Sequence, residues 1–336
     1  MCPPGPVVAK SLMRIESRWF KGSAGRNVCS TDSMWVHLIS PASHAAQYFD
    51  SGGSRFPDRA QATQRPGHQH AVREFTVRIA AGIEYDGAGY HGWQAQRQGV
   101  QTIQSKVEHA LSFVANHPVR VICAGRTDTG VHAREQVVHF DTDSKRSVRS
   151  WVLGANVNLP ADIAVNWVRP VDKSFHARFS ATSRRYRYLI LNRWVRPAIL
   201  QGKVTWHHHP LDEVRMGEAA ANLEGEHDFS TFRAFQCQAK SPVRCVSETA
   251  VSRNSDFVSI DVEANGFLHH MVRNIAGVLM TIGRGEQRPE WVLELLEVRD
   301  RTRGGVTAPP DGLYFVRATY DPEFGLPSTV DSPRYS

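Results

Sequence analysis

Cysteine is scarce in this sequence, and its spacing excludes two kinds of site. The 336 residues include five cysteines, an odd number, and no two of them form a C-x-x-C pair. Such a set favours neither a structural zinc site nor a disulfide framework. We therefore expect a reducing compartment, the cytoplasm, as the location of the protein.

Long apolar runs are absent as well. The longest mostly apolar run, IAGVLMTIG at residues 275–283, is less than half of the roughly 20 residues that a membrane span needs. The sequence therefore predicts no transmembrane helix and no membrane partner. A G-x-S-x-G motif is also missing, so a serine nucleophile of the hydrolase type is not supported.

The histidine clusters lack the spacing of a metal-dependent hydrolase. Histidines stand together at 207–209 and at 269–270, but neither group has the i, i+4 spacing with a carboxylate that a zinc hydrolase uses. Solvated or hydrogen-bonded structural histidines are the favoured interpretation. We expect no metal and no cofactor.

The positive charge is modest and unevenly placed. The formal net charge is +7, and residues 1–70 hold eight Lys/Arg against four Asp/Glu, which leaves +3 for the rest of the chain. Nucleic-acid binding by the folded part would therefore require basic groups clustered on one surface.

The chain divides into four segments. Residues 1–72 lack sustained periodicity and are rich in Ser, Gly, Pro, His and Gln, which predicts a disordered or poorly structured N-terminal extension. A targeting role for this extension and a non-native start of the chain both remain open. Two α+β domains are expected at 73–178 and 179–322, followed by a tail at 323–336.

The order of the expected elements indicates an α+β fold. Strands near 75–85, 119–124, 135–141 and 163–169 alternate with helices from about 102 and around 147–156, which is the β-α-β-β-α-β order of ferredoxin-like domains. A second set nearly repeats this order, with strands at 185–191, 243–253, 257–264 and 313–320 and helices after Pro210, at 267–283 and at 289–298. Two such halves predict a mostly antiparallel sheet with a ligand cleft between them.

A glycine motif near the first strand matches a dinucleotide fingerprint only in its letters. GAGYHG at 87–92 fits G-x-G-x-x-G, but about ten residues separate it from the next helical pattern. A turn is therefore favoured over a nucleotide site. The aromatic residues Tyr90, His91 and Trp93 could instead offer flat faces to a base.

Asp128 is the candidate acid of a turn that carries a single carboxylate. It stands in AGRTDTG at 124–130, and the next acidic residue is Glu135. From the local pattern a turn or helix N-cap role is the alternative.

Two basic stretches are candidates for binding. In SRRYRYLI, Tyr186 and Tyr188 would point to one face of a strand, with Arg185 and Arg187 on the other, which suits either base stacking with phosphate contacts or an ordinary half-buried strand. In NGFLHHMVRNIAG, Arg273 lies opposite the apolar stripe of a helix and beside small residues. Such an arginine either faces water or pairs with a carboxylate where another backbone comes close.

Six motifs together resemble the tRNA pseudouridine synthase A (TruA) family. They are YDGAGYHGWQAQ, AGRTDTGVHA, FHARFSATSRRYRY, DFSTFRA, HHMVRNIAG and DGLYFVRATY, in this order from about residue 75 to 321. Residues before 73 match nothing in the family, and Thr129 stands where alanine is commoner.

The resemblance implies roles for five residues. It makes Asp128 the catalytic aspartate, Arg126 the residue that helps to position or displace the target nucleotide, and Tyr186 the ring that stacks on the target uracil. Tyr186 is also a candidate for the removal of the C5 proton at the end of the reaction. It makes Arg273 the ion-pair partner of the aspartate and Leu313 an apolar residue of the same pocket. We therefore expect Arg273 within salt-bridge reach of Asp128 and close to Tyr186.

The resemblance also implies an activity and partners. The expected enzyme is a cofactor-independent RNA isomerase that converts uridine to pseudouridine at positions 38 to 40 of the tRNA anticodon arm and works as a homodimer. A tRNA-binding or folding module of the same fold without turnover is the alternative, and a dinucleotide-dependent oxidoreductase is a third.

Overall fold

The computed structural model describes residues 76–96 and 99–327, and these residues belong to one compact unit. The predictions for the N-terminal extension at 1–72 lie outside the described residues. Among the residues described, no helix is long and apolar enough to cross a membrane.

The N-terminal half has the expected β-α-β-β-α-β order. Its elements are β1 (Val77–Tyr85), α1 (Ile103–Ala115), β2 (Ile122–Cys123), β3 (His132–Thr142), α2 (Val148–Asn158) and β4 (Ile163–Val171). The strands β4, β1 and β3 are neighbours in the sheet, and β2 pairs with β3. This is the strand order of a ferredoxin-like domain.

Strand β2 is shorter than the predicted strand at 119–124. The N–H groups of Val119 and Val121 donate to the side chains of Ser112 (2.8 Å) and Glu108 (3.1 Å) on α1. Because these backbone groups are already satisfied by a helix, only Ile122 and Cys123 form the strand.

The C-terminal half repeats the order with two short additions. Its elements are β5 (Ala181–Asn192), β6 (Thr205–His207), α3 (Glu213–Ala221), β7 (Gly225–Asp228), β8 (Val243–Asn254), β9 (Phe257–Ala264), α4 (Met271–Gly283), α5 (Trp291–Val298) and β10 (Leu313–Tyr320), with short 3₁₀ turns at Ser230–Phe232, Arg301–Arg303 and Pro322–Phe324. The strand order β10-β5-β9-β8 matches that of the first half. The sequence analysis missed β6 and β7, which are too short to show a period.

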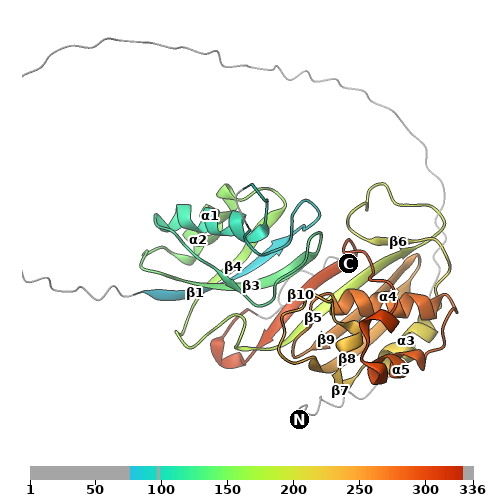
Figure 1. Ribbon diagram of the computed structural model, residues 1–336. Helices are drawn as coiled ribbons and strands as arrows, with labels where there is room; N and C mark the ends of the chain where they lie inside the picture. Colours follow the sequence, from blue (N-terminus) through green and yellow to red (C-terminus); the bar gives the residue numbers. More distant parts are fainter. Residues whose placement is uncertain (1–75, 97–98, 328–336) are drawn as a thin grey trace, which may run out of the picture. The chain divides into compact units, whose positions relative to one another are not determined.

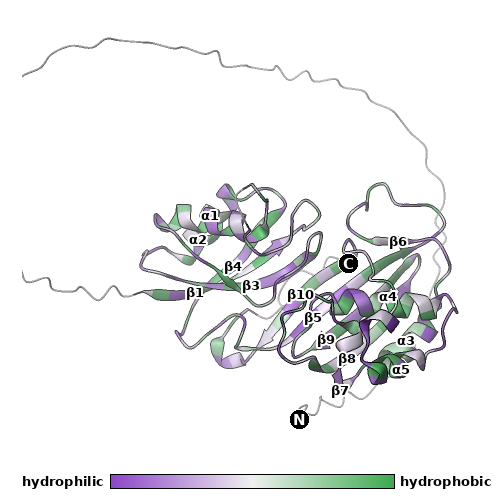
Figure 2. Ribbon diagram, in the orientation of Figure 1, coloured by the Kyte–Doolittle hydropathy of each residue, from purple (hydrophilic) through white to green (hydrophobic). Residues whose placement is uncertain are grey.

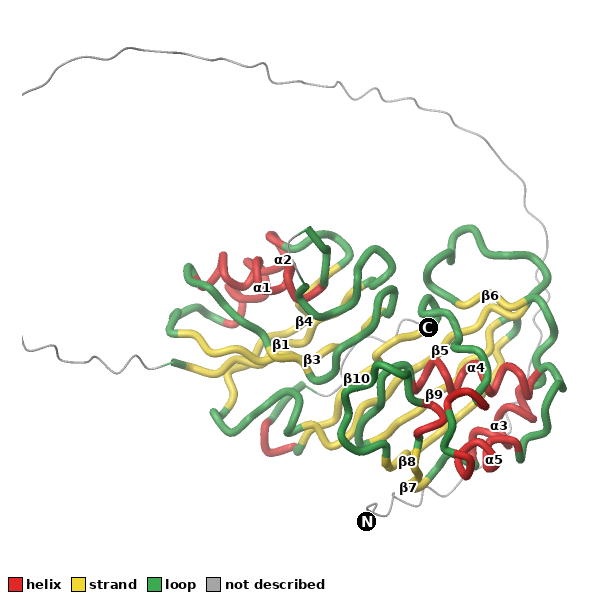
Figure 3. The backbone as a smooth tube through the Cα atoms, viewed as in Figure 1, coloured by secondary structure: helices red, strands yellow, loops and turns green. Residues whose placement is uncertain are grey.

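A short contact between two strands joins the halves into one sheet of ten strands. β3 and β10 run parallel over two residue pairs, Tyr314 with His132 and Phe315 with Ala133. Helices α1 and α2 lie over the strands of the N-terminal half, and α3, α4 and α5 lie over those of the C-terminal half (Figures 1 and 3). The proposed boundary between residues 178 and 179 falls in the link between β4 and β5 and remains an interpretation.

Helix α4 is the most deeply buried helix of the C-terminal half. Four residues of its predicted apolar stripe, Met271, Ile275, Val278 and Ile282, are each at most 1% exposed. The fifth, Phe267, precedes the helix and is half-buried. Figure 2 shows apolar colour along this helix. Burial of each such side chain contributes about 1.5–3 kcal/mol. The helix begins at Met271 and not at residue 267 as predicted, because His270 has a φ of 61° and ends the preceding turn.

The small residues of α4 admit another backbone, as the sequence indicated. A Cβ atom on Gly277 would lie 1.9 Å from the carbonyl oxygen of Val306. We expect Gly277→Ala to lower the free energy of unfolding by about 2 kcal/mol or more, because the segment around Val306 must move. Gly217→Ala on α3 is the matched control, since its Cβ atom would meet nothing closer than 4.0 Å.

Urea unfolding measures both variants. Gly217→Ala should raise stability by up to about 1 kcal/mol through helix propensity. Equal effects of the two substitutions would contradict the close approach of the Val306 backbone.

A buried histidine should make the fold sensitive to acid. His139 in β3 is 3% exposed, and its Nδ1 atom accepts the Ala177 N–H at 3.1 Å. Burial lowers the pKa of His139 from 6.5 to about 4. Between these values the unfolded chain binds the proton and the folded chain does not, so stability falls as the pH drops from 6.5 towards 4.

We expect His139→Gln to reduce this fall by up to about 1.4 kcal/mol per pH unit. Unfolding in urea at about pH 7.5 and about pH 5 checks it. His109→Gln, at an exposed position of α1, should leave the pH dependence unchanged. A variant His139→Gln with the same pH dependence as the unchanged protein would refute the assignment.

Candidate active site at the junction of the two halves

Side chains of the N-terminal sheet stabilise the turn that carries Asp128 by hydrogen bonds. The N–H of Gly125 donates to Oε1 of Gln136 at 3.3 Å, and Nε2 of Gln136 donates to the Gly125 carbonyl at 2.6 Å. The hydroxyls of Thr127 and Tyr85 lie 2.8 Å apart in a buried hydrogen bond. Gln136 is fully buried, so this amide fixes the backbone just before Asp128.

The GAGYHG segment supports the same turn. The N–H of Trp93 donates to the Thr127 carbonyl at 3.0 Å, and the N–H of Gly130 donates to the Tyr90 carbonyl at 3.3 Å. Gly92 has a φ of 81°, and a Cβ atom there would lie 2.7 Å from the Thr127 oxygen. The turn interpretation is thus confirmed. Tyr90 and Trp93 are buried, so their rings are not open to a base.

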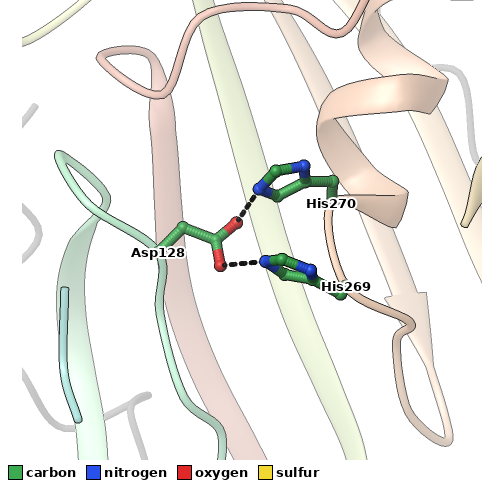
Figure 4. A group of neighbouring side chains, drawn as sticks. All are labelled: Asp128, His269 and His270. Carbon is green, nitrogen blue, oxygen red and sulfur yellow. Dashed lines mark ion pairs between the residues drawn. The ribbon is translucent and has the colours of Figure 1, made fainter. Parts of the chain in front are cut away.

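Three cationic or ionisable side chains surround the Asp128 carboxylate. Nε2 of His269 lies 3.3 Å from Oδ1, and Nε2 of His270 lies 3.5 Å from Oδ2 (Figure 4). Nη1 of Arg273 lies 3.9 Å from Oδ2. The predicted approach of Arg273 to Asp128 is confirmed. The carboxylate points towards α4, and in the described part of the chain it caps no helix.

The start of α4 presents these groups to Asp128. His270 adopts the left-handed backbone conformation as the N-cap, which is uncommon for a residue with a side chain. Burial lowers the pKa of His270 and so favours the neutral imidazole, although the charge of Asp128 acts in the opposite direction. Nε of Arg273 donates to the Ala308 carbonyl at 2.8 Å, so a second segment fixes the guanidinium.

His269 and His270 are functional candidates that were predicted to be structural histidines. Their spacing does not fit a zinc hydrolase, and their partner Asp128 stands about 140 residues earlier in the chain. Their position immediately before the helix that carries Arg273 is the feature of the sequence that indicates a place near Asp128.

The same cluster is where a metal ion could be held in the described part of the chain. Ligand atoms of Asp128, His269 and His270 all lie within 4.8 Å of one another. The fixed positive charge of Arg273 beside Oδ2 opposes a cation at this place. The donor set alone therefore does not assign a metal centre.

Tyr186 forms an aromatic wall of the site. It lies in β5, is 8% exposed, and packs edge-on against Phe267 and Phe315 with ring centroids 5.0 and 5.2 Å away. Burial raises the pKa of Tyr186 well above its ordinary value, so its hydroxyl is protonated at neutral pH. Leu313 in β10 is 5% exposed and lines the same pocket.

One large pocket contains the predicted site. Its volume is about 1030 Å³, and Asp128, Arg126, Tyr186, Arg273 and Leu313 all line it. Its lining includes one carboxylate, that of Asp128, and five arginines, at positions 126, 178, 184, 244 and 273. The clustering of positive charge that RNA binding requires is therefore found here.

Comparison with known proteins identifies the family. The family model described as tRNA pseudouridine synthase matches residues 81–180 and 219–321. A tRNA pseudouridine synthase A of Nitrosococcus oceani is 59% identical over 251 residues, which are 75% of this chain and 96% of the relative. A protein of the same name from Pseudomonas aeruginosa is 57% identical over 258 residues, which are 77% of this chain and 90% of the relative. The chain belongs to the tRNA pseudouridine synthase A family.

Among solved structures, a Cbf5-Nop10-Gar1 complex is similar at 11% identity and a TM-score of 0.26, covering 60% of this chain and 45% of that one. This likeness is too distant to support an argument. The matched segments of the family model contain Asp128 and Arg273, and Tyr186 lies in the stretch between them.

Arg184 ties the pocket of this family member together. Its guanidinium donates to the carbonyls of Asn265 (2.9 Å), Ala181 (3.0 Å) and Ala124 (3.3 Å), and also to that of Arg178. These carbonyls belong to the turn before Asp128, the link between the halves and the turn before α4. One side chain therefore joins the segments that make the site.

Arg185 and Arg187 do not line the pocket. They lie on the other face of β5, where Arg187 pairs with Asp261 at 3.0 Å and Arg185 pairs with Glu248 at 3.0 Å. Glu263 and Arg317 extend this network on the same face, at 3.1 Å from each other. The pairing reduces the charge that these arginines offer to phosphate, and their role in substrate binding stays a prediction without support from the pocket.

We expect Arg184→Lys to lower the free energy of unfolding by about 2–3 kcal/mol, because an ammonium group cannot reach all four carbonyls. Arg187→Lys in the same strand is the control and should change stability by less than about 1 kcal/mol, since a lysine can keep a pair with Asp261. Urea unfolding compares the two variants. A cost at residue 187 as large as that at residue 184 would argue against the joining role.

Proposed function

We propose that this protein isomerises uridine to pseudouridine in tRNA, with Asp128 as the catalytic group. The observation that carries the proposal is the lone carboxylate of a pocket with five arginines, faced by Arg273 and two imidazoles. Family membership supports the reaction, because the relatives are named for it.

The proposed reaction balances without a cofactor. The N1–C1′ glycosidic bond breaks, the uracil turns, and a C5–C1′ bond forms. The C5 proton leaves and N1 gains one, so substrate and product have the same atoms and no redox partner is consumed. A single carboxylate that acts as a nucleophile or takes the ribose 2′ proton is sufficient.

The pocket geometry suggests how the other residues act. Arg273, fixed by Ala308, supplies a counter-charge to the Asp128 carboxylate. Tyr186 offers a ring held by two neighbouring aromatic side chains on which the uracil can stack. Flipping the nucleotide costs a few kcal/mol, and stacking returns about 1–3 kcal/mol. Because its hydroxyl is protonated, Tyr186 serves as a stacking surface and not as a ready base.

Arg126 and Leu313 complete the proposed substrate contacts. Arg126 is exposed on the catalytic turn, two residues before Asp128, where it can take the place of the flipped nucleotide. Leu313 lies opposite Tyr188 in the register of β10 and β5 and closes the apolar side of the pocket.

The finer substrate and the assembly are part of the same proposal. We take the anticodon arm, at uridines 38 to 40, as the target, a homodimer as the working form and the cytoplasm as the compartment. These three points rest on the resemblance of the motifs. The pocket is consistent with recognition by backbone charge and shape, because its charged groups suit phosphates more than base edges.

Tritium release from [5-³H]uridine-labelled tRNA tests the reaction. We expect the intact protein to release tritium and Asp128→Asn to release it at least about 1000-fold more slowly, since the amide is neither base nor nucleophile. Binding of the same tRNA should persist in the variant. Tight binding by the intact protein without any release would favour the alternative, a tRNA-binding module without turnover.

A further inference from the structure

Phe179 is an exposed aromatic side chain at the edge of the pocket. It is 76% exposed and lines the pocket together with its neighbour Arg178. A single exposed apolar residue is ordinary on a protein surface and by itself needs no explanation. Its position beside the catalytic site and the way its ring is held distinguish Phe179.

The turn beneath Phe179 is fixed by a histidine. Nδ1 of His176 faces the N–H groups of Arg178 and Phe179, each at 3.2 Å, and accepts from them. The N–H of Ser180 donates to the His176 carbonyl at 2.8 Å, and the N–H of His176 donates to Oγ of Ser180 at 2.9 Å. These four hydrogen bonds hold the turn in one conformation.

The ring of Phe179 stacks on that of His176, which in turn contacts a ring of the core. His176 lies almost parallel to Phe179, with ring centroids 4.4 Å apart and an angle of 29°. His139, which is buried in β3, lies 4.7 Å from His176 with its ring tilted by 60°. Phe179 is therefore supported by a ring that itself contacts the core, and its orientation needs no ligand to be set.

A positive charge accompanies this ring. The guanidinium carbon of Arg178 lies over the ring of Phe179, 5.5 Å from its centroid, and in the described residues Arg178 has no ion pair with a carboxylate. Because this contact is long and Phe179 is 76% exposed, a base that stacks on the ring can displace the guanidinium towards a phosphate. Arg184, the residue that joins the pocket segments, binds the Arg178 carbonyl and so links the turn to the Asp128 side of the site. A flat ring with an unpaired arginine beside it is the combination that binds single-stranded nucleotides.

We propose that Phe179 and Arg178 form a stacking site for an unpaired base next to the target uridine. The identity of the ligand as RNA rests on the proposed function. When the target nucleotide leaves its stack, its neighbour loses a stacking partner, and the ring of Phe179 replaces it while Arg178 contacts the adjoining phosphate. Because every base has a π face, this site accepts neighbours of any sequence.

The test measures binding of an anticodon-arm stem-loop RNA to the full chain. We expect Phe179→Ala to raise the Kd about 10- to 100-fold, and Phe179→Tyr, which keeps the ring, to stay within about twofold. Phe113→Ala is the matched control, because Phe113 on α1 is 70% exposed and does not line the pocket. It should leave the Kd unchanged.

An abasic nucleotide identifies the contact. The same variants are measured with RNAs that lack the base on the 5′ side or on the 3′ side of the target. The loss of affinity caused by Phe179→Ala should disappear with one of these two RNAs, because an RNA without that base cannot stack on Phe179 in either protein. An unchanged Kd in Phe179→Ala, or a loss that is the same with the intact RNA and both abasic RNAs, would overturn the proposal.

Failure of this inference and failure of the proposed function are distinguishable. The stacking site is tested by comparing Kd values, whereas the isomerase activity is tested by tritium release from tRNA by the unchanged protein. Release with no coupling between Phe179 and a neighbouring base rejects the stacking site alone. Coupling without release rejects the isomerase and leaves an RNA-binding site in place.

Discussion

The site depends first on the hydrogen bonds of one half-buried arginine. The Arg184 guanidinium donates hydrogen bonds to the backbone carbonyls of Arg178 and Ala181, close to it in the sequence, and to those of Ala124 and Asn265, which are far from it. Burial lowers the pKa of this side chain, yet a guanidinium keeps its proton in proteins. Only a planar group with a fork of donors can hold several carbonyls at once, which makes the position intolerant of other cations.

The hydrogen bonds of Arg184 are important because the sheet alone joins the two halves weakly. β3 and β10 pair over only two residues, whereas β1 pairs with β3 and β5 pairs with β9 along most of their length. The turn that carries Asp128 follows β2 in one half, and His269, His270 and Arg273 stand at the start of α4 in the other. The carboxylate and its partners therefore meet only when the two halves are correctly packed.

The electrostatics of the pocket separate two tasks. A guanidinium and two imidazoles stand within 4 Å of the Asp128 carboxylate, so the charge of this carboxylate is matched locally. Elsewhere in the pocket lining, Arg126, Arg178 and Arg244 have no acidic partner. On the far face of β5, by contrast, Arg185 and Arg187 are paired with acids. Arg184 in β5 therefore lines the pocket, whereas Arg185 and Arg187 form ion pairs away from it. For Arg184 and its neighbour Arg185 this difference follows because successive side chains of a strand point to opposite faces of the sheet.

Sequence by itself determined most of the helices and strands, and the resemblance of its motifs pointed to Asp128 as the proposed reacting group. Periodicity located most strands and helices, the alternation in RYRYLIL placed Tyr186 and Tyr188 inward, and the small residues after Arg273 indicated a close backbone, because these signals depend on residues within a few positions of one another. Only the tertiary structure decided that His269 and His270 face Asp128, that Arg184 binds backbone carbonyls of segments far apart in the chain, and that Phe179 stands at the edge of the pocket. These contacts join residues up to about 140 positions apart, and they follow from how two halves pack, which no local period records.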